Sequence, residues 1–227
     1  MIPLLDAIRQ RHSVRAFQAR PLEPAAKEDL AQLVAQCNAA GHLHMQLVTD
    51  EPKAFDCFLS HYGKFTGVAN YLALCGQPAP DLDERLGYWG EKVVLRAQQL
   101  GLNSCWVGLT FTKVQGAYTL EAGEKLRLVI ALGYGTSEGK QHKSKRPDQV
   151  SRSLLPGGEA VPEWFQAGVE AALLAPTAVN QQKFRFTLHD DHTVGATAGI
   201  GFFSKVDLGI AKLHFEIGAA PAEVVWR

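Results

Sequence analysis

Two stretches of the sequence, RHSVRAF at Arg11–Phe17 and APTAVNQQKFRF at Ala175–Phe186, decide how this chain is interpreted. The first places Arg11, Ser13 and Arg15 at every second position, and in an extended chain such side chains point to one side. Guanidinium forks and hydroxyl groups are the donors best suited to a phosphate monoester. The first stretch is therefore a candidate anion site, although a solvated basic segment would have the same composition.

The second stretch ends one predicted element and begins another. A helical pattern over residues 162–176 stops at Pro176, and a strand-like pattern begins at Lys183. Between them, Thr177 and Asn180 are neutral hydrogen-bonding side chains suited to the carbonyl and ring-nitrogen edges of a ligand. Taken alone, this stretch is more typical of a helix C-terminus followed by a turn.

A third stretch, LGLNSCWVGL at Leu100–Leu109, follows the clearest long helical pattern and has Gly108 inside an apolar run. Gly108 at a tight bend, beside a core Trp106, is the simpler interpretation of that run. Taken together, however, the three stretches resemble the FMN site of the nitroreductase family. In ordinary members the first two stretches lie near the N-terminus of each chain, and each site takes one from each subunit of a dimer.

Here the first two stretches lie about 160 residues apart in one chain. The resemblance therefore implies a single-chain pseudo-dimer with an α+β fold: a three-layer α-β-α sandwich with two pseudo-repeats around a mixed, mainly antiparallel sheet. Residues 1–227 would form one interleaved domain, with pseudo-repeats over about residues 1–152 and 156–227.

Internal similarity supports the repeat. Residues 24–50 and 162–191 each contain a proline-started helix, a short connection, a strand and an Asp-containing turn. Any two such units would look alike, so the repeat is a hypothesis. Only the first unit has an RxSxR segment before it, and only the second has PTAVNQQ, which predicts one FMN site per chain.

The resemblance also assigns roles to single residues. Arg11 and Ser13 would hold the flavin phosphate, and Arg15 would lie near the pyrimidine edge of the ring, where a cation stabilises reduced flavin. His12 would contribute through its backbone. The full set of predicted FMN-binding residues is Arg11, His12, Ser13, Arg15, Gly108, Leu109, Lys145, Arg146, Pro176, Thr177, Ala178 and Asn180.

The remaining residues of this set would contact the flavin from other directions. Pro176, Thr177 and Asn180 would touch the ring and ribityl chain, and the backbone N–H groups of Gly108 and Leu109 would reach the ring nitrogen that accepts hydride. In the basic segment HKSKRP (residues 142–147), Lys145 and Arg146 would complete the phosphate site, although such charge runs are usually solvated. Two departures from the family pattern are Thr177 in place of Ser and Lys183-Phe184 in place of Pro-Trp.

The composition argues against several classes of protein. The 227 residues hold 23 Lys and Arg against 23 Asp and Glu, and this zero net charge argues against a nucleic-acid partner. Cys37, Cys57, Cys75 and Cys105 are too far apart for a CxxC pair or a zinc knuckle, and isolated thiols favour the reduced cytoplasm. No secretory leader, apolar run of about 18 residues or metal motif is present, so neither a membrane nor a metal is expected.

Hydrophobic periodicity predicts the remaining elements. Apolar residues spaced three and four apart indicate helices over residues 3–10, 24–40, 82–100, 162–176 and 204–219. Apolar or alternating runs indicate strands over residues 43–50, 70–76, 125–134 and 183–191, with a further apolar stretch at 103–111 and a short strand in the tail at 222–227. Residues 56–68 fit neither pattern.

The resemblance implies an NAD(P)H-dependent FMN oxidoreductase of the nitroreductase or quinone reductase kind, which passes hydride to a small electron-poor acceptor by a ping-pong mechanism. The flavin would carry the chemistry, so no catalytic side chain is expected. An internal pseudo-dimer would allow the protein to act as a monomer. Two alternatives stay open: a flavin-binding sensor or carrier without turnover, and a degenerate relative with an empty site.

Overall fold

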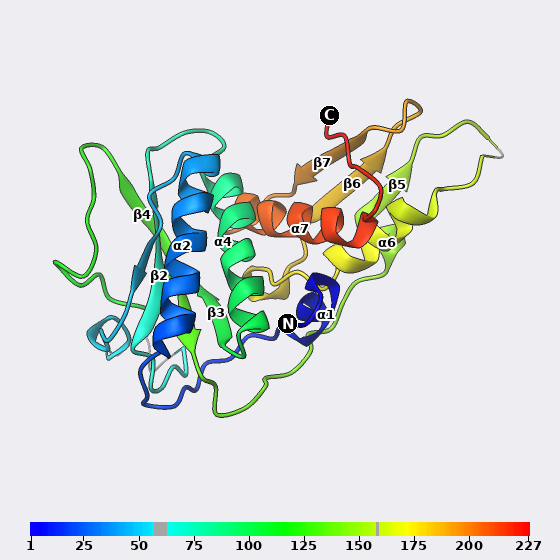
Figure 1. Ribbon diagram of the computed structural model, residues 1–227. Helices are drawn as coiled ribbons and strands as arrows, with labels where there is room; N and C mark the ends of the chain where they lie inside the picture. The colour runs from blue at the N-terminus through cyan, green and yellow to red at the C-terminus, as the bar shows by residue number, and fades with distance from the viewer. Residues whose placement is uncertain (57–62, 158) are drawn as a thin grey trace.

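The computed structural model describes residues 1–56, 63–157 and 159–227, and Figure 1 shows how its elements are arranged. The α-helices are α1 (Leu4–Gln10), α2 (Pro24–Gly41), α4 (Leu82–Gln99), α5 (Pro147–Val150), α6 (Glu163–Ala172) and α7 (Ser204–Ala219), and the 3-10 helices are η1 (Lys53–Phe55) and η2 (Ala178–Asn180). The strands are β1 (Gln46–Val48), β2 (Asn70–Gly76), β3 (Asn103–Val107), β4 (Lys125–Gly133), β5 (Ser151–Ser153), β6 (Phe184–Leu188) and β7 (Val194–Ala198). The predicted α+β class is confirmed, while Cys57 and part of the ambiguous stretch 56–68 lie outside the described residues.

The strands form two sheets. The first is antiparallel, with the strand order β1-β2-β4-β3. The second has the order β5-β6-β7, in which β5 runs parallel to β6 and β7 runs antiparallel to it. Figure 1 shows α2 and α4 on one side of the first sheet, with α7 extending from α4 toward the second sheet. Most strand pairs are antiparallel, as predicted, and the described strands form two separate sheets.

The elements with the strongest apolar patterns have the predicted bounds. All seven residues of β2 are buried, as expected for a continuous apolar run covered on both faces. Helix α7 spans the predicted residues 204–219. The sequence did not predict β7, whose residues VGATA are mostly small, and the Gly and Ala residues among them disfavour strands. The tail predicted as a strand forms a single bridge, between Trp226 and Val194.

Helices α4 and α7 join the two halves of the chain through a close crossing. A Cβ atom on Gly87 would lie 2.1 Å from the carbonyl oxygen of Val206, and one on Gly209 would lie 2.0 Å from that of Glu84. Only residues without a Cβ allow two backbones to approach so closely. Buried side chains from both sheets belong to one hydrophobic cluster around this crossing, so the two halves share a core.

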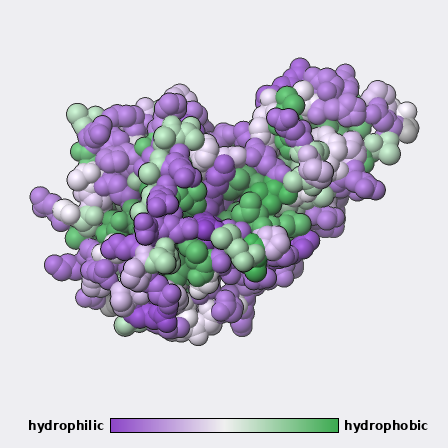
Figure 2. Space-filling model, viewed as in Figure 1, coloured by the Kyte–Doolittle hydropathy of each residue, from purple (hydrophilic) through white to green (hydrophobic). Residues whose placement is uncertain are grey.

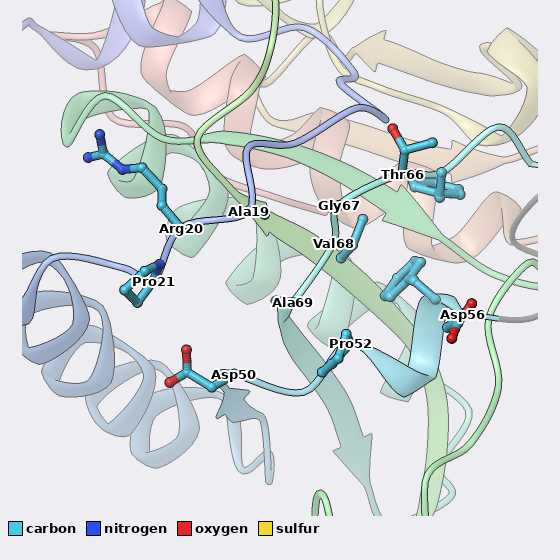
Figure 3. Close-up of a pocket in the computed structure, with 12 residues that line it drawn as sticks. Ala19, Arg20, Pro21, Asp50, Pro52, Asp56, Thr66, Gly67, Val68 and Ala69 are labelled. Atoms are coloured by element: carbon cyan, nitrogen blue, oxygen red, sulfur yellow. The ribbon is translucent and has the colours of Figure 1, made fainter.

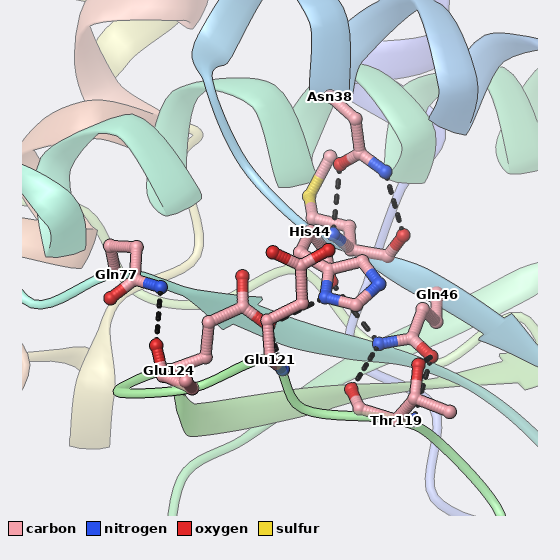
Figure 4. Close-up of polar contacts among 9 residues, drawn as sticks. Asn38, His44, Gln46, Gln77, Thr119, Glu121 and Glu124 are labelled. Carbon is pink, nitrogen blue, oxygen red and sulfur yellow. Dashed lines mark hydrogen bonds and ion pairs between the residues drawn. The ribbon is translucent and has the colours of Figure 1, made fainter.

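One side chain connects the end of α2 to the start of β1 (Figure 4). Asn38 Nδ2 donates to the carbonyl oxygen of Met45 at 2.8 Å, and the Met45 N–H donates to Asn38 Oδ1 at 2.8 Å. His42, just after the helix, has a φ of 49° and reverses the chain. The predicted strand over residues 43–50 begins only at Gln46, because the residues before it complete this turn. His44 Nδ1 then lies 2.6 Å from Glu124 Oε2 in the segment before β4.

Hydrophobic side chains gather on the face where α1, α4 and α7 meet, as Figure 2 shows. A groove of about 670 Å³ lies among these helices, and its apolar lining includes Leu5, Leu33, Leu95, Leu213 and Ile217. None of the described helices is both long and apolar enough to cross a membrane. The groove contains none of the residues that the sequence assigned to FMN, so the candidate site lies elsewhere.

Candidate functional site

A cavity of about 120 Å³ lies where the two distant stretches of the sequence meet. The residues of the predicted FMN set that line it are Ser13, Arg15, Gly108, Pro176, Thr177 and Ala178. The end of β3 and the start of α7 complete the lining. The fold thus brings together segments about 160 residues apart, and the role of these residues in binding stays a prediction.

The stretch after α1 runs beside β3. The Val14 N–H donates to the Ser104 carbonyl oxygen at 3.0 Å, and Ser13 forms a parallel bridge with Ser104. This pairing keeps the chain extended, so successive side chains point to opposite sides. Val14 is buried in the core, whereas Ser13 and Arg15 are exposed and line the cavity. Arg15 has no ion-pair partner in the described part of the chain, and its guanidinium carbon lies 5.8 Å from the centre of the Phe65 ring.

The second stretch leaves α6 as an irregular loop. Val179, Asn180 and Gln182 have φ values of 47°, 56° and 45°, a left-handed conformation that is uncommon for residues other than glycine. The Gln182 N–H donates to Thr177 Oγ1 at 3.1 Å, which holds the loop closed on itself. Non-glycine residues persist in this conformation where surrounding contacts impose it, and they are concentrated at functional sites.

The basic segment at residues 142–146 runs alongside this loop. Asn180 Nδ2 donates to the Lys143 carbonyl oxygen at 2.9 Å, and Lys145 Nζ donates to the Gln182 carbonyl oxygen at 2.8 Å. The Lys145 N–H also donates to Gln182 Oε1 at 2.8 Å. The structure therefore places Lys145 and Asn180 together, next to the cavity-lining loop although outside the cavity itself.

Three other predicted residues also lie outside the cavity. Arg146 is exposed and pairs with Asp148, at 3.0 Å between Nη2 and Oδ2. The Leu109 side chain is 70% exposed beside Gly108. His12 is partly buried next to Arg11, and burial together with the Arg11 charge lowers its pKa, which favours the neutral ring. The side chains of Arg146 and Leu109 are thus directed to solvent.

Arg11 turns into the protein interior and does not line the cavity. Its side chain is 2% exposed, and its Nε lies 3.8 Å from Oε1 of Glu91, a fully buried carboxylate on α4. Glu91 Oε1 also lies 2.9 Å from His214 Nε2, and Glu91 Oε2 accepts a hydrogen bond from Trp106 Nε1 at 2.8 Å. Burial lowers the pKa of Arg11, against the attraction of Glu91. These residues form a buried polar cluster joining α4, α7, β3 and the segment after α1.

Sequence reasoning missed three residues of this region: Glu91 in that cluster, and Asp207 and Phe203 in the cavity wall. Asp207 is buried, and its two carboxylate oxygens accept hydrogen bonds from the Ala178 N–H at 3.0 Å and Gln181 Nε2 at 2.7 Å. Burial raises the pKa of Asp207 to about 6. Glu91 and Asp207 each occupy an apolar helix face, and a carboxylate at a core position was the available signal.

A larger hollow, of about 650 Å³, lies on the far side of the first stretch (Figure 3). Arg20 and Asp50 lie toward one end of it, and Asp56 lies toward the other. None of the residues predicted to bind FMN lines this hollow. The described residues also contain no group of three or more His, Cys, Asp or Glu side chains that could hold a metal ion. The smaller cavity is therefore the candidate site.

The family model described as "Putative TM nitroreductase" matches residues 3–219. The chain belongs to this nitroreductase family. A Thermotoga maritima protein named as a nitroreductase superposes with a TM-score of 0.63 at 20% identity, over 96% of this chain and 83% of that chain. A Desulfovibrio desulfuricans nitroreductase in complex with FMN superposes with a TM-score of 0.53 at 16% identity, over 71% of this chain and 99% of that chain. No curated protein matches the sequence.

The nitroreductase fold raises the question of whether the site suits FMN. Ser13 and Arg15 line the cavity with a hydroxyl group and a guanidinium group, which suit a phosphate-bearing ligand, whereas the unpartnered buried atoms of Arg11 and Ser104 lie outside the lining. The volume of the cavity does not suit FMN, because pockets that hold drug-sized ligands have volumes of about 300 Å³ or more. The cavity has about 120 Å³. The polar groups fit FMN, whereas the cavity in this conformation is too small for the flavin ring.

Proposed function

We propose that this nitroreductase-family chain is an FMN-dependent oxidoreductase that passes hydride from NADH or NADPH to a small electron-poor acceptor, such as a nitroaromatic or a quinone, in a ping-pong cycle. The observation that carries the proposal is the convergence of Ser13 and Arg15 with Pro176, Thr177 and Ala178 around one cavity. Family membership and the FMN bound by the Desulfovibrio relative add support. When bound, FMN would supply the hydride chemistry, and the protein would supply binding and orientation.

The residues of the cavity would orient the ligand. Arg15 carries an unpaired positive charge there, which would favour an anionic ring edge. Gly108 presents backbone without a side chain, which permits a planar group to approach closely. Lys145, beside the loop, would provide positive charge for a phosphate, whereas Arg11 would do so only if its side chain left the buried Glu91.

We also infer that the chain is an internal pseudo-dimer with one site, able to act as a monomer. Supporting observations are the reciprocal contacts of Gly87 and Gly209 at the α4–α7 crossing and the shared hydrophobic core. The Desulfovibrio chain matches along 99% of its own length but along only 71% of this chain, so part of this chain lies outside the match. The buried free thiols of Cys37, Cys75 and Cys105 agree with a reducing compartment such as the cytoplasm.

A specific observation favours a second candidate, a family member that binds flavin without turnover or does not bind it. The cavity volume of about 120 Å³ is well below that of an open cofactor site. The same cavity residues would serve a sensor or carrier. The two candidates differ in whether a reduced nicotinamide nucleotide reduces the bound flavin.

The test is an absorbance spectrum of the purified protein after incubation with FMN and removal of free FMN, followed by anaerobic titration with NADH and NADPH. The proposal expects retained flavin, bleaching by one of the two nucleotides, and recovery of colour on adding a quinone. Retained flavin that neither nucleotide bleaches would favour the carrier. A colourless protein would favour the empty relative.

A charge variant tests the assignment of the cavity itself. Arg15→Ala should weaken FMN binding about tenfold to a hundredfold, because a charge-assisted contact contributes about 1.5–3 kcal/mol. Arg9→Ala is a matched control, since Arg9 is exposed, pairs with Asp6 on α1 and does not line the cavity. Equal FMN dissociation constants for the two variants would remove Arg15 from the site.

A further inference from the structure

The ring of Phe203 covers Gly108 in the wall of the cavity. A Cβ atom on Gly108 would lie 2.3 Å from Cε2 and 2.5 Å from Cζ of the Phe203 ring. The aromatic ring therefore rests directly on the glycine backbone, the surface that lacks a side chain and would suit a flat ligand. Phe203 and Gly108 both line the same cavity. Part of the space next to Gly108 is filled by this chain's own aromatic side chain.

Phe203 is held in an uncommon backbone conformation. It directly precedes α7 and has a φ of 55°, in the left-handed region. For an aromatic residue this conformation is unusual and costs about 1–3 kcal/mol. A change of the Phe203 backbone that moves the ring away would release this strain. The energy released would offset part of the stabilisation that the ring loses when it is no longer buried.

The segment before Phe203 is built for local movement. It contains Gly199 and Gly201, and its side chains at Ile200 and Phe202 are 96% and 81% exposed, so few side-chain contacts hold it. Two side chains hold its backbone: Lys183 Nζ donates to the carbonyl oxygen of Ile200 at 2.8 Å, and Gln181 Nε2 donates to that of Phe202 at 2.8 Å. The Gly199 N–H also donates to the Lys183 carbonyl oxygen at 2.7 Å. None of these bonds holds the Phe203 ring itself.

We propose that Phe203 is an aromatic gate: its ring occupies part of the flavin-ring site over Gly108, and FMN enters only when the ring is displaced. The inference rests on the proposed FMN site and explains its small volume. Among the molecules of a solution, only the fraction with the ring displaced would bind, so the measured affinity is the intrinsic affinity reduced by that fraction. Phe203 is thus a positioning residue that sets how readily this chain takes its cofactor.

The experiment compares FMN dissociation constants, by quenching of FMN fluorescence, for the wild type, Phe203→Ala and Phe202→Ala. Phe202 is the matched control, because it is the same residue type in the same segment but is 81% exposed. We expect Phe203→Ala to bind FMN at least about tenfold more tightly than the wild type, because the gate would leave the wild-type site open in about a tenth of the molecules or fewer. Phe202→Ala should stay within about twofold of the wild type. Far-UV circular dichroism checks that each variant is folded.

A second measurement needs only the wild-type protein. With rising FMN concentration, the rate of fluorescence quenching in stopped flow should level off at the rate of ring displacement. The gate is refuted, and the flavin site stands, if the wild type binds FMN with a quenching rate that rises linearly with FMN concentration and Phe203→Ala binds FMN no more tightly than the wild type. If Phe203→Ala binds FMN and the wild type does not, the gate is supported and the proposed function of the wild type fails. If no folded variant binds FMN, the proposed function fails and the gate fails with it.

Discussion

Removal of the Glu91 carboxylate should destabilise the fold severely. In Glu91→Leu, the Arg11 guanidinium stays buried without its counterion, and a broken buried ion pair costs about 3–5 kcal/mol. Trp106 Nε1, now 2.8 Å from Glu91 Oε2, and His214 Nε2, 2.9 Å from Oε1, lose their partner as well. Each such loss adds about 1–3 kcal/mol. We therefore expect a loss of at least about 5 kcal/mol, a large part of the roughly 5–15 kcal/mol that stabilises a typical domain.

The assay is urea unfolding followed by far-UV circular dichroism, with the free energy of unfolding taken by linear extrapolation. Glu84→Ala is the control, because Glu84 lies on the same helix but is partly exposed and pairs with Lys212 at 2.9 Å near the surface. Such a pair contributes at most about 1 kcal/mol. The double variant Arg11→Met with Glu91→Leu removes both buried charges and should recover much of the loss, because apolar replacement of a buried ion pair is often neutral.

Two results would refute this reasoning. Glu91→Leu within about 1 kcal/mol of the wild type would mean that the Arg11 charge does not depend on Glu91. A double variant as unstable as the sum of its two single variants would mean that the residues do not interact, since only coupled sites depart from additivity.

Three further predictions concern stability alone. Burial raises the pKa of Asp207 from 3.8 to about 6. Protonation of Asp207 therefore stabilises the fold by about 3 kcal/mol below pH 4, and this stabilisation is lost as the pH rises through 6. Urea unfolding at a series of pH values should show this fall in the wild type and not in Asp207→Asn. Gly209→Ala should lower the unfolding free energy by about 3 kcal/mol or more, through contact with a backbone oxygen, whereas Gly157→Ala, with open space around it, should not. Asn38→Ala should cost about 1–3 kcal/mol through its two lost hydrogen bonds to Met45, read from the urea midpoint, and an unchanged midpoint would show that the α2–β1 connection does not depend on them.

Much of the secondary structure could be predicted from the sequence, because its longer elements carry unambiguous local patterns. The apolar run Asn70–Gly76 is a strand and the periodic segment Ser204–Ala219 is a helix. The short strands β5 and β7 could not be predicted in this way. They depend on pairing with β6, which is not visible in their own residues.

Only part of the candidate site could be predicted from the sequence, because some of its residues are placed by contacts with distant parts of the chain. Alternation along an extended chain could indicate that Ser13 and Arg15 share a side, and the two line the cavity together. The same alternation wrongly placed Arg11 with them, because a buried carboxylate on α4 draws its guanidinium inward. The position of Glu91 opposite Arg11 is a long-range contact, and no local pattern encodes it.

By itself, the sequence determined the longer helices and strands, and through its motifs it pointed to the nitroreductase family, because spacing and residue type act locally. Only the tertiary structure decided that α4 and α7 cross at Gly87 and Gly209 and that Phe203 covers Gly108. Both arrangements depend on backbones and rings meeting from distant parts of the chain. Close packing permits them only where a missing Cβ leaves room.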